Sequence, residues 1–164
     1  MSTKSASRCF DELEYLNIDV LGMKGKSRVI NIPNDRKQVW QQIENVLRNP
    51  VIRRFVLRED MKLEKKAGIS ALCEYSLLSD NVYPTYAVTK KELKDSAVKV
   101  EKQVSELEEI GCVVLELGYF IDFLGKGFQD PLSVVLSLTG EEQEEERVDI
   151  SINEMLEEYV WSKD

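Results

Sequence analysis

The stretch from Thr89 to Leu124 constrains the fold more than any other part of this 164-residue chain. It opens with Thr89-Lys-Lys-Glu92, a capping box in which the hydroxyl and the carboxylate satisfy backbone N–H groups at a helix start. Apolar residues then recur every seven positions, which predicts one buried helical face, at Leu93, Val100 and Leu107. Gly111 follows where a helix end favours a residue at positive φ, so the helix is expected to end there.

Two interpretations of the residues after Gly111 lead to different folds. The run CVVLELGYFIDF is rich in β-branched and aromatic residues and favours a strand over 112–124, a turn at 125–127 and a return strand over 130–139. This interpretation predicts a helix-rich α+β fold with a small antiparallel sheet. The alternative continues the seven-residue spacing and predicts a mainly α protein with one long helix over 90–124.

The remaining segments complete an expected division into four regions. Residues 1–8 are small and polar and are expected to be a flexible tail. Residues 9–66 are expected to hold a short helix, a hairpin over 18–32, and helices over 35–49 and 50–66. Residues 67–140 carry a helix over 69–78, a loop over 82–86, and the helix and strands described above. Residues 141–164 are expected to form an acidic loop, a strand over 147–152 and a closing helix.

The net charge of −8 conceals a division along the chain. Residues 1–66 contain 14 Lys and Arg against 9 Asp and Glu, a net charge of +5, whereas residues 67–164 contain 8 against 21, a net charge of −13. Opposite charges of this kind either pair within one fold, pair between subunits, or present separate faces to separate partners. The sequence leaves these alternatives open.

The residue types present do not predict catalysis. The chain has no histidine, which removes the usual general base and the commonest metal ligand. Its cysteines, Cys9, Cys73 and Cys112, lack the spacing of a zinc site or a disulfide framework, and no phosphate-binding glycine motif is present. We therefore expect no catalytic residue, no cofactor, no metal site and no enzymatic activity.

Hydropathy predicts the compartment. No apolar run approaches the roughly 18 residues that cross a bilayer, and the first ten residues lack the apolar segment of a secretory signal. An intracellular protein, cytoplasmic or nuclear, without membrane contact is expected.

The central pattern is similar to the second half of a winged-helix domain, in which a recognition helix ends at a glycine and leads into a hairpin. The similarity covers residues 68–138 and rests on Leu93, Val100, Val104, Leu107, Gly111 and Val113. It implies a first helix over 68–78 and a second over 87–93. Winged-helix domains bind DNA or dock on proteins. The expected recognition helix is rich in glutamate and lacks arginine, which favours protein docking.

Basic residues define the predicted interaction site. Arg54, Arg58 and Lys62 recur at helical spacing in the helix expected over 50–66, with Arg53 beside them, and five lysines precede or lie on the expected recognition helix. The candidates for binding nucleic acid or a partner are Arg53, Arg54, Arg58, Lys62, Lys90, Lys91, Lys94, Lys99 and Lys102. A solvated face balanced by neighbouring carboxylates is the alternative for the first four.

The predicted function follows from amphipathic helices, divided charge and the absence of recognisable chemistry. We expect a non-enzymatic interaction protein, a self-associating or partner-bound adaptor subunit of a larger assembly in which nucleic acid is a candidate component. Its expected partner is another protein or a second copy of the chain. The alternative is a winged-helix regulator that binds nucleic acid directly.

Overall fold

The computed structural model describes residues 3–16, 18, 20–31, 35–95, 110–118 and 127–162, and they form an α+β fold. The chain divides into two compact units, Met1–Leu47 and Arg48–Asp164. This division differs from the expected boundary at residue 66, because the segment that follows Arg48 is a strand of the second unit's sheet.

The first unit contains α1 (Thr3–Tyr15), β1 (Leu21–Lys24), β2 (Ser27–Ile30), α2 (Arg36–Ile43) and the 3-10 turn η1 (Glu44–Val46). The predicted hairpin is confirmed: β1 and β2 pair antiparallel, and Gly25 adopts φ +66° in the turn. Asp35 caps α2 by accepting a hydrogen bond from the Gln38 N–H at 3.0 Å, although the helix ends at Ile43 rather than near residue 49.

The expected tail over residues 1–8 is wrong, because α1 begins at Thr3. Ala6, Phe10 and Leu13 are spaced to share one side of a helix, and all three are half-buried. Small polar residues between these positions obscured the pattern.

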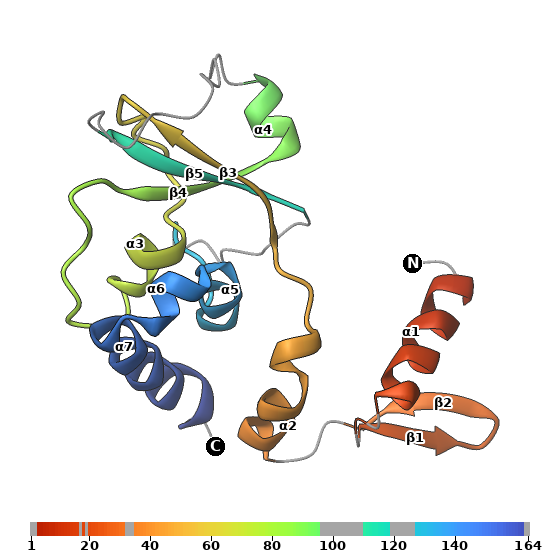
Figure 1. Cartoon of the computed structure of the whole chain (residues 1–164). Helices are drawn as coiled ribbons and strands as arrows, with labels where there is room; N and C mark the ends of the chain where they lie inside the picture. The colour runs from red at the N-terminus through yellow and green to blue at the C-terminus, as the bar shows by residue number, and fades with distance from the viewer. Residues whose placement is uncertain are drawn as a thin grey trace. The chain divides into compact units, whose positions relative to one another are not determined.

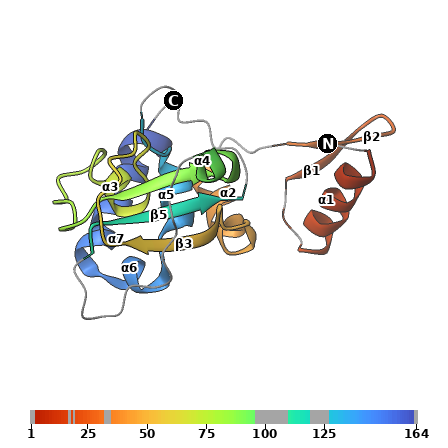
Figure 2. The ribbon, with the colours of Figure 1, turned by 90° about the horizontal axis from the view of Figure 1, so that it is seen from above.

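A three-stranded mixed sheet forms one layer of the second unit (Figure 2). Its order is β3 (Val51–Leu57), β5 (Cys112–Leu117), β4 (Thr85–Thr89), with β3 antiparallel and β4 parallel to the central β5. The predicted strand after Gly111 is confirmed, and all six residues of β5 are buried. The sheet is mixed rather than antiparallel as expected, because β4 pairs parallel with β5. The return strand predicted over 130–139 is wrong, since these residues contain a helix.

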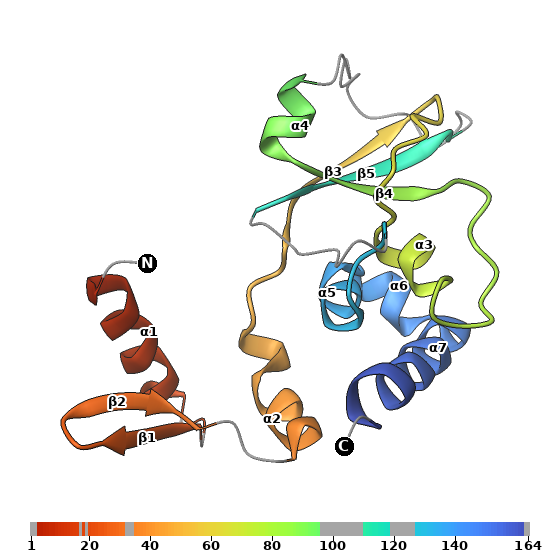
Figure 3. The ribbon, with the colours of Figure 1, turned by 180° about the vertical axis from the view of Figure 1, so that it is seen from behind.

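Helices form the other layer, on one side of the sheet (Figure 1, Figure 3). They are α3 (Gly68–Leu72), α5 (Pro131–Ser137), α6 (Gly140–Glu144), α7 (Glu146–Leu156) and the π-helical turn η2 (Glu157–Trp161). The side chains of these helices pack into a core in which Leu72, Val134, Val148 and Met155 are fully buried. The short helix α4 (Lys90–Asp95) lies on the opposite side of the sheet, where Leu93 packs on the cluster that contains Val114.

Three predicted segments have another secondary structure. The helix expected over 50–66 is β3 and an irregular segment, consistent with the strand-forming residues Val51, Ile52, Phe55 and Val56. The loop expected over 82–86 leads into β4, which starts at Thr85, so the helix expected from Ala87 is a strand up to Thr89 and α4 begins at Lys90. The helix expected over 69–78 is regular only to Leu72.

The C-terminal part is helical where strands and a loop were expected. Asp130 caps α5 by accepting from the Ser133 N–H at 3.0 Å, and Pro131 occupies the first turn. The acidic run begins with α6, which Thr139 and Glu142 start with a capping box. The strand expected over 147–152 belongs to α7, and the closing helix expected from Ser151 is its continuation.

The capping box at Thr89 is confirmed: the Glu92 carboxylate accepts from the Thr89 N–H at 2.7 Å and the Thr89 hydroxyl accepts from the Glu92 N–H at 3.2 Å. An unbroken helix over 90–124 is wrong, because β5 is a strand. The apolar helical face over 96–109 and the turn at 125–126 lie outside the described residues. The winged-helix relationship therefore stays a prediction.

Candidate functional site

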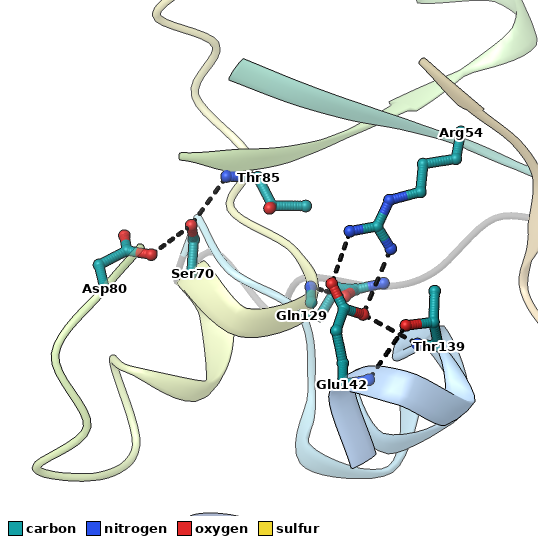
Figure 4. A network of polar contacts seen from close by, with 8 residues as sticks. Arg54, Ser70, Asp80, Thr85, Gln129, Thr139 and Glu142 are labelled. Carbon is teal, nitrogen blue, oxygen red and sulfur yellow. Dashed lines mark hydrogen bonds and ion pairs between the residues drawn. The ribbon is translucent and has the colours of Figure 1, made fainter. Parts of the chain in front are cut away.

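Arg53 and Arg54 lie on β3 and point to opposite faces of the sheet. Arg54 reaches toward the helices, where its Nη2 contacts Oε1 of Glu142 on α6 at 2.5 Å (Figure 4). Arg53 points the other way: its Nε donates to Glu116 Oε2 at 2.5 Å, and its guanidinium lies 5.2 Å from the centre of the Phe55 ring. The two arginines therefore do not form the single basic stripe that helical spacing predicted.

The charge division is compensated inside the second unit. Four cations of the segment 53–66 pair with carboxylates that come later in the sequence: Arg53 with Glu116, Arg54 with Glu142, Lys65 with Glu92, and Lys66 with Glu74. For these residues, the basic and acidic parts of the chain therefore pair within one fold. The paired cations are less available to phosphate or to an acidic partner.

The other predicted binding residues are dispersed. Lys62 adopts φ +48° and donates its N–H to Asp60 Oδ1 at 2.9 Å, and Arg58 follows directly after β3. Among the described residues, exposed lysines of the sequence prediction come together only on α4, as Lys90, Lys91 and Lys94. Lys99 and Lys102 lie outside the described residues.

Buried polar side chains fix the helices to the sheet (Figure 4). Gln129 is fully buried; its Oε1 accepts from the Gly68 N–H at 3.0 Å, and its Nε2 donates to Ser137 Oγ at 3.0 Å. The Ser70 hydroxyl donates to Asp80 Oδ1 at 2.8 Å and accepts from the Thr85 N–H at 2.8 Å. These groups satisfy one another, so the network holds the backbone in place rather than offering a reactive group.

An open hollow of about 780 Å³ lies between the turn that follows α3 and the C-terminal helical turns. Four glutamates, two tyrosines and a leucine contribute most of its wall. The lining residues are Glu74, Tyr75, Ser76, Leu77, Glu154, Glu157, Glu158, Tyr159 and Ser162. Because α7 and η2 carry Glu154, Glu157 and Glu158 at helical spacings of three and four, these carboxylates fall on one side of the helix.

Tyr75 and Tyr159 contribute uncharged aromatic surface to the wall of the hollow. Their rings contact edge to face with centroids 5.0 Å apart, and the Tyr75 hydroxyl donates to the Gln129 carbonyl at 2.8 Å. Burial raises the pKa of Tyr75 to about 12, and the neighbouring Glu158 charge raises the pKa of Tyr159. At neutral pH the phenols are therefore neutral, and the glutamates give the hollow its negative charge.

Such a hollow suits a cation on an alkyl stem. Carboxylates attract the charged head, whereas the tyrosine rings and Leu77 accept the methylene groups. Sequence reasoning missed this site because Tyr75 belongs to another part of the chain. The spacing of the three glutamates within the expected closing helix was the available signal, but it does not indicate that Glu74 and Tyr75 lie beside them.

Within the described residues no three potential ligands converge as a metal site would require, so the glutamates of the hollow surround it without meeting at one point. None of the described helices is long and apolar enough to span a membrane. No protein-family model, curated protein or solved structure matches the chain.

Proposed function

We propose that this protein is a non-enzymatic interaction protein that binds a basic segment of a partner protein. The observation that carries the proposal is the acidic, tyrosine-containing hollow beside η2, lined by Glu74, Glu154, Glu157 and Glu158. A lysine or arginine side chain of the partner enters the hollow, and its charge is balanced by Glu154 and Glu158, because Glu74 is already paired with Lys66.

The chemistry of the wall supports a side chain of a protein rather than a free metal ion. Tyr75, Leu77 and Tyr159 supply apolar surface that a bare ion does not use, whereas the stem of lysine or arginine does. Leu77 is fully exposed in the described structure, so a partner that covers it gains apolar burial in addition to charge pairing. The acidic balance of residues 67–164 attracts a basic partner before contact.

A peptide titration tests the proposal. The probe is a synthetic peptide of alternating lysine and alanine, compared with the same peptide carrying acetylated lysines. We expect calorimetry to detect binding of the first peptide only, with affinity that falls as salt is added. In the double variant Glu154→Gln/Glu158→Gln we expect about tenfold weaker binding, since two carboxylates of the hollow lose their charge.

The matched control is Glu141→Gln/Glu144→Gln, which removes the same charge from exposed positions of α6 that do not line the hollow. It should bind the lysine peptide nearly as the unmodified protein does. Equal weakening by both double variants would mean that net charge alone attracts the peptide, and the proposed site would then be abandoned.

Nucleic-acid binding remains the second candidate, and the exposed lysines of α4 favour it. Lys90, Lys91 and Lys94 lie within two helical turns on the side of the sheet away from the hollow. Phosphate contacts predict retention on duplex DNA that weakens steeply with salt and is lost when the three lysines become alanine. Unaltered retention in that variant, or none by the unmodified protein at low salt, would remove this candidate.

A further inference from the structure

The two outer edges of the three-stranded sheet differ in their backbone hydrogen bonding. Beside β4, the Ala67 N–H donates to the Thr85 carbonyl at 2.9 Å and the Ala87 N–H donates to the Lys65 carbonyl at 2.8 Å. Lys66 in turn bridges to Phe128 on its other side. On the β3 side, the described part of the chain provides no strand that pairs with the outer edge (Figure 2). The outer edge of β3, which pairs with no strand of the described residues, is an open template for another strand.

We propose that two copies of this chain associate by antiparallel pairing of β3 with β3, centred on Phe55. In this register Phe55 lies opposite Phe55 of the second copy. Arg54 then lies opposite Val56, and Arg53 opposite Leu57. The two sheets become one six-stranded sheet with the two helical layers on the same side. The surface involved is separate from the acidic hollow, so this proposal does not depend on the proposed function.

The side chains of β3 favour a second copy in this register. Like charges placed directly opposite each other destabilise a strand pair, and the register sets each arginine against an apolar residue. Phe55 and Val56 lie on opposite faces of β3 and are only half-buried, so an added strand covers both. The charges of Arg53 and Arg54 are already balanced by Glu116 and Glu142, which reduces their repulsion of a second basic strand.

The regular part of β3 fits this pairing. The register with β5 shifts between Val51 and Arg53, which marks a bulge at Ile52, and it runs without interruption from Arg53 to Leu57. Pairing centred on Phe55 uses only this uninterrupted part. Since the other edge of the sheet is closed by residues 65–67, the contact forms a two-fold dimer and cannot propagate into a fibre.

Site-directed crosslinking tests the register. In a background with the exposed Cys9 changed to serine, Phe55→Cys places two thiols opposite each other across the two-fold axis, within reach of a disulfide. Ile52→Cys is the matched control on the same strand, because this register separates its two copies by about 20 Å at 3.3 Å per residue. After oxidation with oxidised glutathione, we expect a crosslinked dimer from Phe55→Cys and almost none from Ile52→Cys, by intact mass under non-reducing conditions.

If circular dichroism shows that Phe55→Cys does not fold, the mass of the unmodified protein in solution tests the dimer. Light scattering of the unmodified protein across the micromolar range should approach twice the monomer mass of 18.9 kDa. A mass that stays at 18.9 kDa at every concentration overturns the dimer. Crosslinking of Ile52→Cys as complete as that of Phe55→Cys overturns the register.

Discussion

Arg54 and Glu142 form a two-point ion pair between the layers of the second unit: Nη2 lies 2.5 Å from Oε1, and Nη1 lies 3.3 Å from Oε2. The same carboxylate accepts the Thr139 N–H at 2.8 Å and so completes the capping box of α6. One side chain therefore starts a helix and fastens it to β3. Burial favours the neutral form of Glu142, but the hydrogen bonds from Arg54 and Thr139 outweigh it and hold the pKa of this carboxyl below its usual value.

A double-mutant cycle measures this pair. Glu142→Gln keeps an acceptor for the Thr139 N–H and removes the charge, and Arg54→Met removes the guanidinium. Because both side chains are partly buried, we expect a coupling free energy of about 1 kcal/mol, above the value for a fully exposed pair. Urea unfolding of the four proteins gives this quantity. Additive effects of the two substitutions would show that the contact contributes nothing to stability.

Glu92 should give the protein a stability that depends on acid. The hydrogen bond from Lys65, followed by that from the Thr89 N–H, lowers the pKa of Glu92 from 4.5 to about 2. The folded state binds a proton at Glu92 less readily than the unfolded state does. The contribution of ionised Glu92 to the free energy of unfolding is therefore complete above about pH 4.5 and is lost as the pH falls toward 2. The Glu92 side chain is 45% exposed, which limits the effect to about 1 kcal/mol or less.

Glu92→Gln isolates this charge, because glutamine still accepts at the capping box. Its unfolding free energy should fall less steeply than that of the unmodified protein between pH 4.5 and 2. Glu144→Gln, a change of equal charge at an exposed position, serves as the control. Parallel pH curves for Glu92→Gln and the unmodified protein would contradict the assignment.

The buried amide of Gln129 should be among the most sensitive positions. Replacement by leucine leaves the Gly68 N–H without its partner in a site that excludes water, at an expected cost of about 2–3 kcal/mol. Gln143→Leu removes one hydrogen bond from an exposed glutamine and should cost less than about 1 kcal/mol. Chemical denaturation compares the two. Equal costs would mean that water or a rearranged backbone satisfies Gly68.

Two glycines should respond to alanine in opposite directions. A Cβ at Gly111 would overlap the backbone of Arg58 and Glu59, so Gly111→Ala should destabilise the fold by about 1–3 kcal/mol. At Gly140, in the first turn of α6, no atom lies within 4 Å of the added Cβ. Gly140→Ala should therefore stabilise the protein by about 0.5 kcal/mol through the unfolded state. Thermal unfolding of both variants checks the signs.

Structural features that depend on residues close together in the chain could be predicted from the sequence. The capping box at Thr89, the cap at Asp35, the hairpin around Gly25 and the strand after Gly111 each depend on residues within one or two turns, and each is present. The sequence predicted Gly111 as a residue with positive φ at a helix end, and this role is wrong. Its φ is not positive, and the residue is required because the chain passes close to Arg58.

Signals that depend on distant residues could not be read in this way. Arg53 and Arg54 fitted a helical stripe, but each arginine belongs to one face of a strand and pairs with a carboxylate far along the chain. The run LSVVLSLT favours a strand by composition, yet Asp130 caps a helix, α5, that packs on α3 and α7, and Thr139 caps the start of the next helix. The hollow likewise joins Tyr75 to residues of the C-terminal helix, which no local pattern connects.

The tripeptide at residues 65–67 has a consequence for how the second unit opens. Toward β4, its Ala67 N–H donates to Thr85 and its Lys65 carbonyl accepts from Ala87. Toward the segment that leads into α5, its Lys66 N–H donates to the Gly127 carbonyl at 2.8 Å. The sheet and the helical layer thus share one run of backbone hydrogen bonds, and neither layer is released while the other stays intact. The amide protons of Ala67, Val114 and Val134 are accordingly expected to exchange with solvent at a common free energy, as members of a single cooperative folding unit.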